Sequence, residues 1–462
     1  MKLKFSKSFR DLVNYLLAGG LARLLPFLLL PYIARILTPE NFGLFSLYRL
    51  YIALGSVLLL FGVDQGLFRL LPEVSENKRR KYLSSAVIFV VFVVIVFSII
   101  SWPWHDQLNK LLLKPDLPVP FFILPLLILV NGLSTLILTS FSAQQQSKKF
   151  LMGNLLVQVT FFLLFLAGLQ AGWQLKSFFV SFLLANLLLL SVNGKLILFA
   201  FQFIPELHIL KQLLKTGLPL MFLLLLTYLL YQSDHYIIKF YLGVEQTGVY
   251  NYGYRFASML LIFVVQSNNV WLPRVYARGE DFFKQHFSAY ASLIALACAA
   301  ILWFLVLLFH YFSGLLIPSG FEISKQILLI VGLGYIVYGQ AQMIDAWLIL
   351  KHKSRILVWI SMIALILNIS LNLYLIPRFG LPAAALVTSL SFLFIWLAIL
   401  IYLKQVLNAK TLILSALKTV LYILPFFLLF FNDSPLFPGL IFFLMAILEI
   451  ATNPLLKTIW QQ

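Results

Sequence analysis

The stretch "AVIFVVFVVIVFSII", residues 86–100, is an almost unbroken apolar run. A strand of a transmembrane barrel alternates between lipid-facing and lumen-facing residues, and this run leaves no polar face for a lumen. A backbone in hydrocarbon must satisfy its own hydrogen bonds, and outside a closed barrel only an α-helix does so. The stretch therefore predicts a membrane-spanning helix.

The composition extends this conclusion to the whole chain. Of 462 residues, 62% are hydrophobic and 11% are charged, which excludes a water-soluble globular protein. A helix needs roughly 20 apolar residues to cross a bilayer. Such stretches begin near positions 11, 42, 82, 118, 150, 175, 212, 246, 287, 325, 355, 380, 411 and 435. We therefore predict an all-α polytopic membrane protein with about fourteen transmembrane helices.

The net charge of +18 is explained by topology. Most of the Lys and Arg residues lie in every second loop, beginning with "MKLKFSKSFR" (1–10), as expected for loops that face the cytosol. We expect both termini to be cytosolic and the protein to lie in the inner, cytoplasmic membrane, with no nucleic-acid partner. Four basic residues fall inside predicted helices instead: Arg23, Arg49, Arg255 and Lys418.

Two pairs of segments indicate an internal repeat. "PENFGLFSLYR" (39–49) returns, with one inserted residue, as "VEQTGVYNYGYR" (244–255), and "SAQQQSKKF" (142–150) resembles "LILKHKSRI" (348–356). A six-helix duplication predicts two lobes related by a pseudo-twofold axis along the membrane normal. We expect an N-lobe at 1–205, a C-lobe at 206–405 and two C-terminal helices at 406–462.

Arginine inside the membrane needs a compensating role, because insertion costs about 2.5 to 3.5 kcal/mol. Arg49 and Arg255 occupy equivalent repeat positions and follow Tyr48 and Tyr254, whereas Arg23 lies near the middle of the first helix. Guanidinium groups lining a cavity between the lobes would hold a phosphate or pyrophosphate in bidentate fashion. The alternatives are snorkelling or structural ion pairs with Asp64, Asp234 or Asp345.

Other polar residues and prolines could shape such a cavity. Polar side chains share one face of the tenth predicted helix and recur on the seventh, as a cavity wall or as hydrogen-bonding partners between helices of the two lobes. They are Tyr335, Tyr338, Gln342 and Asp345 on the tenth helix, and Tyr228, Gln232 and His235 on the seventh. Pro26 and Pro31 predict a bent first helix, which would serve as a gate or as a static kink.

A second group of residues has the chemistry of a cation site. Asp234 lies late in the seventh predicted helix, Asn368 and Asn372 share a face of the eleventh, and Thr388 lies in the twelfth. One carboxylate with amide and hydroxyl oxygens suits a monovalent cation such as sodium. Asn and Thr also commonly join helices by hydrogen bonds, so a structural role is the alternative.

Several enzyme signatures are missing from the sequence. It contains no nucleotide-binding "GxxxxGK[ST]" motif, no HExxH or GxSxG motif, and no Cys and His cluster with metal-ligand spacing. Its single cysteine, Cys298, excludes an internal disulfide. We expect a transporter without catalytic residues.

The chain resembles the polysaccharide transporter, or Wzx-type, branch of the multidrug, oligosaccharidyl-lipid and polysaccharide (MOP) flippase superfamily. The resemblance rests on "LPYIARILTPENFGLFSL" (30–47), "FGVDQGLFRLLPE" (61–73), "GVYNYGYRF" (248–256) and "LNLYLIPRFGLPAAALVTSLS" (371–391). It implies two six-helix lobes around a cavity that opens alternately to each side, plus two C-terminal helices. It also implies export of an oligosaccharide on polyprenyl pyrophosphate, for surface polysaccharide or O-antigen biosynthesis.

The related MurJ-like lipid II flippases suggest roles for individual residues. Arg23, Arg49 and Arg255 look like their pyrophosphate-binding arginines. The sodium site of these flippases has a spacing that fits Asp234, Asn368, Asn372 and Thr388. At the position of Asn372, the sodium site of these flippases can have an acidic residue instead. The resemblance thus implies sodium or a proton as coupling ion and no other cofactor.

These features predict a monomeric flippase that binds membrane lipids and a lipid-linked oligosaccharide, working beside polysaccharide polymerase machinery. The alternatives within the superfamily are a drug antiporter of the multidrug (MATE) type, driven by protons or sodium, and a MurJ-like lipid II flippase. A polymerase or ligase would need a long external loop, which the sequence lacks, and a non-transporting scaffold would show no lipid flipping.

Overall fold

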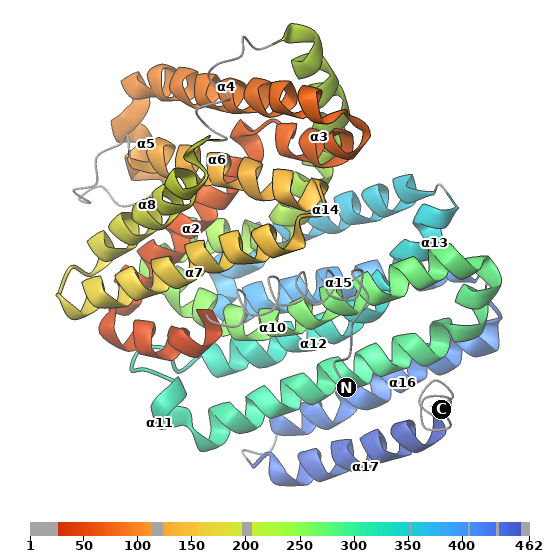
Figure 1. Cartoon of the computed structure of the whole chain (residues 1–462). Coiled ribbons are helices and arrows are strands. Elements are labelled where there is room, and N and C mark those ends of the chain that lie inside the picture. Colours follow the sequence, from red (N-terminus) through yellow and green to blue (C-terminus); the bar gives the residue numbers. More distant parts are fainter. Residues whose placement is uncertain are drawn as a thin grey trace, which may run out of the picture. The chain divides into compact units, whose positions relative to one another are not determined.

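The structure is a computed structural model that describes residues 26–112, 123–195, 206–351, 353–404, 407–430 and 434–453. Within these ranges the chain forms helices and no strands (Figure 1). Ten of the helices are long and apolar enough to cross a membrane, and two shorter apolar helices cover Pro26–Ile36 and Leu436–Thr452. The prediction of an all-α polytopic membrane protein is confirmed.

In the first half of the chain, the predicted stretches that begin near 42, 82, 118, 150 and 175 each form a helix, and two short helices, at Val63–Leu70 and His105–Leu112, lie between them. Thr38 caps the second helix by accepting a hydrogen bond from the Asn41 amide, and a proline follows at the first helical position, both typical helix-start signals. After Pro26–Ile36 come α2 (Pro39–Leu59), α3 (Val63–Leu70), α4 (Glu76–Ser101), α5 (His105–Leu112), α6 (Ile123–Ala143), α7 (Ser147–Gln170) and α8 (Leu175–Val192).

The second half begins with α10 (Leu207–Tyr311), which is three helices in one run. Gly243 and Gly279 interrupt it with φ angles of 90° and 79°, which side-chain-bearing residues rarely adopt. The resulting helices are 207–242, 244–278 and 280–311. They are followed by α11 (Ser313–Leu316), α12 (Ser324–Gln342), α13 (Asp345–Leu350), α14 (Ser354–Phe379), α15 (Leu381–Leu403), α16 (Ala409–Phe427) and α17 (Leu436–Thr452).

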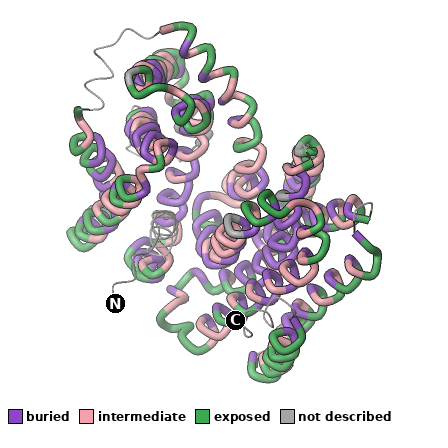
Figure 2. Tube along the Cα trace, turned by 45° about the vertical axis from the view of Figure 1, so that its right-hand side comes forward, coloured by how far each residue is buried: buried purple, intermediate pink, exposed green. Residues whose placement is uncertain are grey.

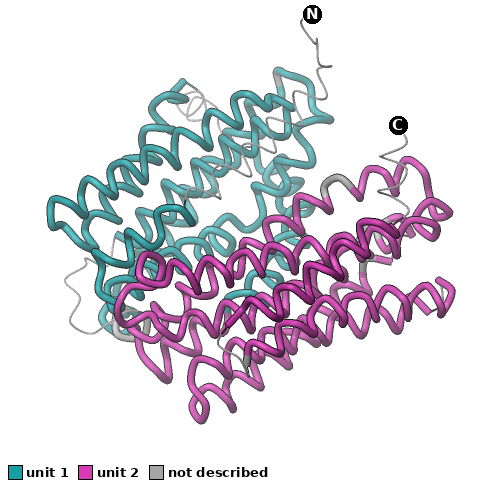
Figure 3. Tube along the Cα trace, turned by 90° about the horizontal axis from the view of Figure 1, so that it is seen from below, with its two compact units in different colours: residues 1–232 teal, residues 233–462 magenta. Residues whose placement is uncertain are grey.

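Internal contacts divide the chain into two compact units, 1–232 and 233–462 (Figure 3). We call them unit 1 and unit 2. The division falls within helix 207–242, so this helix contributes residues to both units. The three-part division at 205 and 405 remains a prediction.

Unit 1 is held together by apolar packing and by a close approach of two backbones. A side chain on Gly217 would lie 1.9 Å from the carbonyl oxygen of Gly62, and one on Gly66 would lie 2.4 Å from that of Leu213. Only glycine allows α3 and the start of α10 to approach this closely. The surrounding core contains buried residues of α2, α3, α4, α6 and α10.

A second region of unit 1 is aromatic. The Phe45 ring stacks on Phe165 at 5.2 Å and meets Phe178 edge-on at 5.3 Å, and Phe161 packs against both Phe165 and Phe178. These rings join α2, α7 and α8. Aromatic pairs of this kind add stability beyond the apolar area that they bury.

Unit 2 is built around α12, which is buried along most of its length and packs against α15. The adjoining helix α14 also packs on α15, and α16 packs on α12 and α17. Cys298, in helix 280–311, is fully buried. Large apolar side chains are exposed along helices of both units, as expected for surfaces that face lipid tails. Figure 2 marks the exposed residues along the trace in green.

Candidate functional site

Arg49 lies in the membrane-spanning helix α2 of unit 1. Its guanidinium carbon is 5.8 Å from the centroid of the Phe45 ring, one turn earlier in the helix. Among the residues that the structure describes, no carboxylate lies within ion-pair distance of Arg49. Among these residues, a structural ion pair therefore does not explain this arginine, whereas Asp345, one of the predicted partners, has a side chain outside the description.

Arg255 is held by a polar contact instead. Its Nε donates to the Asn251 side-chain oxygen at 2.5 Å, again one turn earlier in the same helix. The two arginines occupy equivalent positions of the predicted repeat. Arg23 lies outside the described residues, so its contribution and a shared cavity remain predictions.

The tyrosines that precede these arginines are both buried. The Tyr48 ring packs edge-on against Phe179 at 4.6 Å, and its hydroxyl has no hydrogen-bond partner within the described parts of the chain. The Tyr254 hydroxyl accepts a hydrogen bond from Tyr335 at 2.9 Å. Tyr335 therefore joins α12 to helix 244–278 within unit 2, and hydrogen bonding of the stripe between the lobes remains a prediction.

Other predicted cavity residues are distributed over both units. Tyr228 donates to the Leu50 carbonyl oxygen at 2.7 Å within unit 1, and Gln232 is half-buried. In unit 2, Gln342 donates to the Tyr338 hydroxyl. Asp345 begins α13, and its side chain lies outside what the structure describes.

The two prolines predicted to form a gate lie in helix Pro26–Ile36. Pro26 is half-buried and Pro31 is buried. A gating role for them remains a prediction.

The carboxylate of Asp234 is the centre of a buried polar cluster in unit 2. Its Oδ1 accepts from the backbone N–H of His235 at 2.8 Å and lies 2.7 Å from the His235 Nδ1. Its Oδ2 accepts from the hydroxyls of Tyr250 at 2.6 Å and Thr388 at 3.0 Å. Asp234 is 2% exposed, so these bonds replace the water that the carboxylate loses on burial.

The two asparagines extend this cluster along α14. Asn368 accepts from the Ser233 hydroxyl at 3.0 Å and from the Asn372 amide at 2.9 Å, and it donates to Ser391 at 3.0 Å. The Asn372 side-chain oxygen is buried and has no donor within the residues described. The structure therefore pairs Asp234 with Thr388 and Asn368 with Asn372, and Ser233, the residue before Asp234, contacts the second pair.

The cluster also fits a monovalent cation in its chemistry. It combines a carboxylate with amide and hydroxyl oxygens, and the unpartnered Asn372 oxygen is an acceptor that a cation would satisfy. Tyr250 and His235 would compete with such an ion for the carboxylate. Binding of sodium remains a prediction.

Several polar partners were missed by sequence reasoning. Tyr250, Ser233 and Ser391 belong to the Asp234 cluster, but no spacing rule connects them to Asp234 across separate helices. Glu449, in the last apolar helix, pairs with Lys418 in the helix before it. Two opposite charges in neighbouring apolar stretches were a signal for that pair.

A comparison of the sequence with protein families gives a match over residues 8–277 to the family described as "Polysaccharide biosynthesis protein". This match spans more than half of the chain. The chain belongs to this family. A search of curated protein sequences found no match.

The fold is shared with solved transporter structures. The lipid II flippase MurJ, in an inward closed conformation, matches with a TM-score of 0.67 at 16% identity, over 93% of this chain and 97% of MurJ. An inward-facing multidrug resistance transporter of the MATE family and MOP superfamily matches with a TM-score of 0.63 at 13% identity, over 87% of this chain and 95% of the transporter. The chain is thus a polytopic membrane protein with the MOP flippase fold.

Proposed function

We propose that this protein moves an oligosaccharide linked to polyprenyl pyrophosphate from the cytosolic to the outer leaflet by alternating access. Its family and fold support a membrane flippase for polysaccharide biosynthesis. The lipid-linked substrate, this direction, cytosolic termini and the inner membrane are parts of the proposal. So are a monomeric state, contact with polysaccharide polymerase machinery and the lack of a catalytic reaction.

The observation that carries this proposal is the position of Arg49. A guanidinium within a membrane-spanning helix, with no carboxylate in reach among the described residues, is suited to an anionic ligand. A diphosphate offers the oxygens that a guanidinium binds in bidentate fashion. Arg23, Arg49 and Arg255 would share this anion.

The membrane potential favours export of such a substrate. With a negative cell interior, each negative charge that moves outward gains about 2.3 kcal/mol per 100 mV. A coupling ion is then needed chiefly for the return of the empty carrier. Asp234, Asn368, Asn372 and Thr388 would hold that ion, and it would supply the positive charge that compensates Asp234.

The test is flipping of a fluorescent polyprenyl-pyrophosphate oligosaccharide in proteoliposomes, with gradients of sodium and of protons applied separately. We expect Arg23→Ala/Arg49→Ala/Arg255→Ala to abolish flipping while the purified protein remains folded. Full activity of this triple variant would overturn the diphosphate site. Export of a cationic drug with no flipping would support the multidrug alternative, whose fold is the same.

A further inference from the structure

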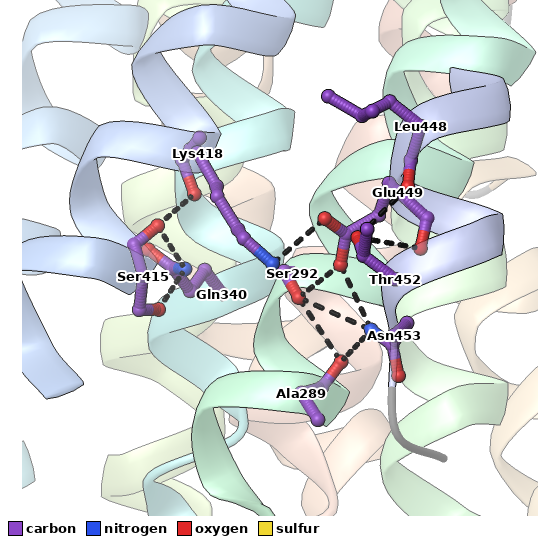
Figure 4. Close-up of polar contacts among 10 residues, drawn as sticks. Ala289, Ser292, Gln340, Ser415, Lys418, Leu448, Glu449, Thr452 and Asn453 are labelled. Carbon is purple, nitrogen blue, oxygen red and sulfur yellow. Dashed lines mark hydrogen bonds and ion pairs between the residues drawn. The ribbon is translucent and has the colours of Figure 1, made fainter. Parts of the chain in front are cut away.

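Two charged residues within the apolar C-terminal helices take no part in the proposed transport site. The Lys418 Nζ in α16 lies 2.7 Å from the Glu449 Oε2 in α17, and the Glu449 side chain is 4% exposed. Each of these charges alone would be costly within the membrane, and the pair is electrically neutral. Figure 4 shows this pair and the residues around it.

The second carboxylate oxygen of Glu449 joins α17 to another helix. This Oε1 accepts from the Ser292 hydroxyl at 2.9 Å and from the Asn453 amide at 2.8 Å. Asn453 also donates to the Ala289 carbonyl oxygen at 3.1 Å. Since Ala289 and Ser292 belong to helix 280–311, the end of α17 is bonded to that helix by two side chains (Figure 4).

A neutral contact fixes α16 in the same way. The Gln340 amide of α12 donates to the Ser415 hydroxyl of α16 at 2.7 Å, and its oxygen accepts from the Trp396 indole of α15. Gln340 and Ser415 are both buried. Thus α16 is bonded to α12, α17 is bonded to helix 280–311, and Lys418 with Glu449 bonds α16 to α17.

We propose that these contacts form an intramembrane clamp that keeps α16 and α17 at a fixed depth and rotation on unit 2 during transport. Apolar contacts alone fix such positions weakly in lipid, because lipid tails compete equally well for apolar side chains. A charge pair favours a single alignment of the two helices, because sliding either helix along the other would separate the two charges and leave each of them buried without its partner. Lys418 and Glu449 therefore act as positioning residues for the two helices.

The clamp is tested by measuring how much the position of α17 varies relative to α14, another helix of unit 2. Spin labels are attached to exposed positions of α14 and α17, using Ile366→Cys and Leu440→Cys in a Cys298→Ala background. Double electron–electron resonance then gives the distribution of distances between them in the full-length protein. We expect one narrow peak in this parent, and loss of that peak to a broad distribution in Lys418→Met and in Glu449→Gln.

A double variant and a matched control make the test specific. Lys418→Met/Glu449→Gln leaves no unpaired charge, so we expect it to broaden the distribution less than either single change. Glu280 also pairs with two lysines, Lys284 and Lys351, but is more exposed, so Glu280→Gln should keep the narrow peak. If a single-charge variant does not fold, Ser292→Ala, which removes one bond and no charge, should give intermediate broadening.

Two results would overturn the clamp. One is a peak that stays as narrow in Lys418→Met, Glu449→Gln and Ser292→Ala as in the parent. The other is a double variant broader than both single variants, because the two charges would then act independently.

Discussion

The hydroxyl of Thr388 donates a 3.0 Å hydrogen bond to Asp234, which lies 154 residues earlier in the chain. This bond has no counterpart in the first repeat. Positions 28 and 29, about 205 residues before Asp234, are both leucine, and position 182, which is 206 residues before Thr388, is phenylalanine. At these positions the two predicted repeats therefore differ in side-chain chemistry.

Removal of the Thr388 hydroxyl should destabilise the protein. In Thr388→Val the carboxylate of Asp234 loses one of its hydrogen bonds in a buried site, and bonds to charged groups contribute about 1.5 to 3 kcal/mol. We therefore expect the free energy of unfolding in detergent to fall by about this amount. Thr388→Ser keeps the hydroxyl and should stay close to the wild type, whereas equal stability of the valine variant would disprove the bond.

Arg49 should be needed for transport and its charge alone should not suffice. If it binds a diphosphate, Arg49→Ala should lower flipping at limiting substrate about 10- to 100-fold, as expected for loss of a charged hydrogen bond. Arg49→Lys should recover only part of that loss, because an ammonium lacks the bidentate fork.

The control for this variant is an arginine that also contacts a ring. Arg378 stacks on Tyr374 with its guanidinium carbon 3.8 Å from the ring centroid, and Tyr374 is exposed. Arg378→Ala should leave the flipping rate in proteoliposomes unchanged. An equal loss of flipping in both variants would mean that the effect comes from the removal of a positive charge and not from a binding site at Arg49.

Gly217→Ala should be strongly destabilising. The added carbon would lie 1.9 Å from the Gly62 carbonyl oxygen, so the two backbones would have to separate, and overpacking of this kind costs about 1 to 3 kcal/mol or more. Gly194→Ala is the matched control, because no atom lies within 4 Å of its added carbon. A lower melting temperature only in Gly217→Ala is the expected result, and equal melting temperatures would refute the close approach.

The ion pair between Lys81 and Glu206 should make stability depend on pH. Their charged atoms are 2.6 Å apart, and the hydrogen bond from Lys81 lowers the pKa of Glu206 below its usual value. The stabilisation is therefore complete above the ordinary glutamate pKa and is lost as pH falls through the lowered one. The melting temperature of Glu206→Gln should be below that of the wild type at neutral pH, and the gap should close in acid. A gap that persists at low pH would contradict this assignment.

The helical fold could be predicted from local composition because each apolar run must form a helix in lipid. Even the break at Gly243 follows from the repeat, where "GVEQTG" stands between two apolar stretches. Helix periodicity, in contrast, cannot say which side chains of separate helices meet. Asn368 and Asn372 could be placed on one face, but the contacts of Asn368 with Ser233 and Ser391 depend on how α14 packs against helix 207–242 and α15.

The candidate site could be predicted only in part, for the same reason. The four residues chosen for a cation site from their chemistry lie in two bonded pairs, Asp234 with Thr388 and Asn368 with Asn372, and the site itself remains a prediction. Tyr250 lies in the motif "GVYNYGYRF" (248–256), but nothing in that motif indicates that its hydroxyl donates to Asp234. The aromatic packing of Phe45 with Phe165 and Phe178 likewise follows from tertiary contacts that no periodicity encodes.

Cys298 provides a natural reporter of motion within unit 2. It is the sole thiol in the chain, and the folded protein hides it completely. A thiol-reactive dye can therefore label only molecules whose interior has opened, so the labelling rate would measure how often the helix bundle of unit 2 opens. The same rate measured during turnover would tell whether transport proceeds by rigid-body movement or requires the bundle itself to loosen.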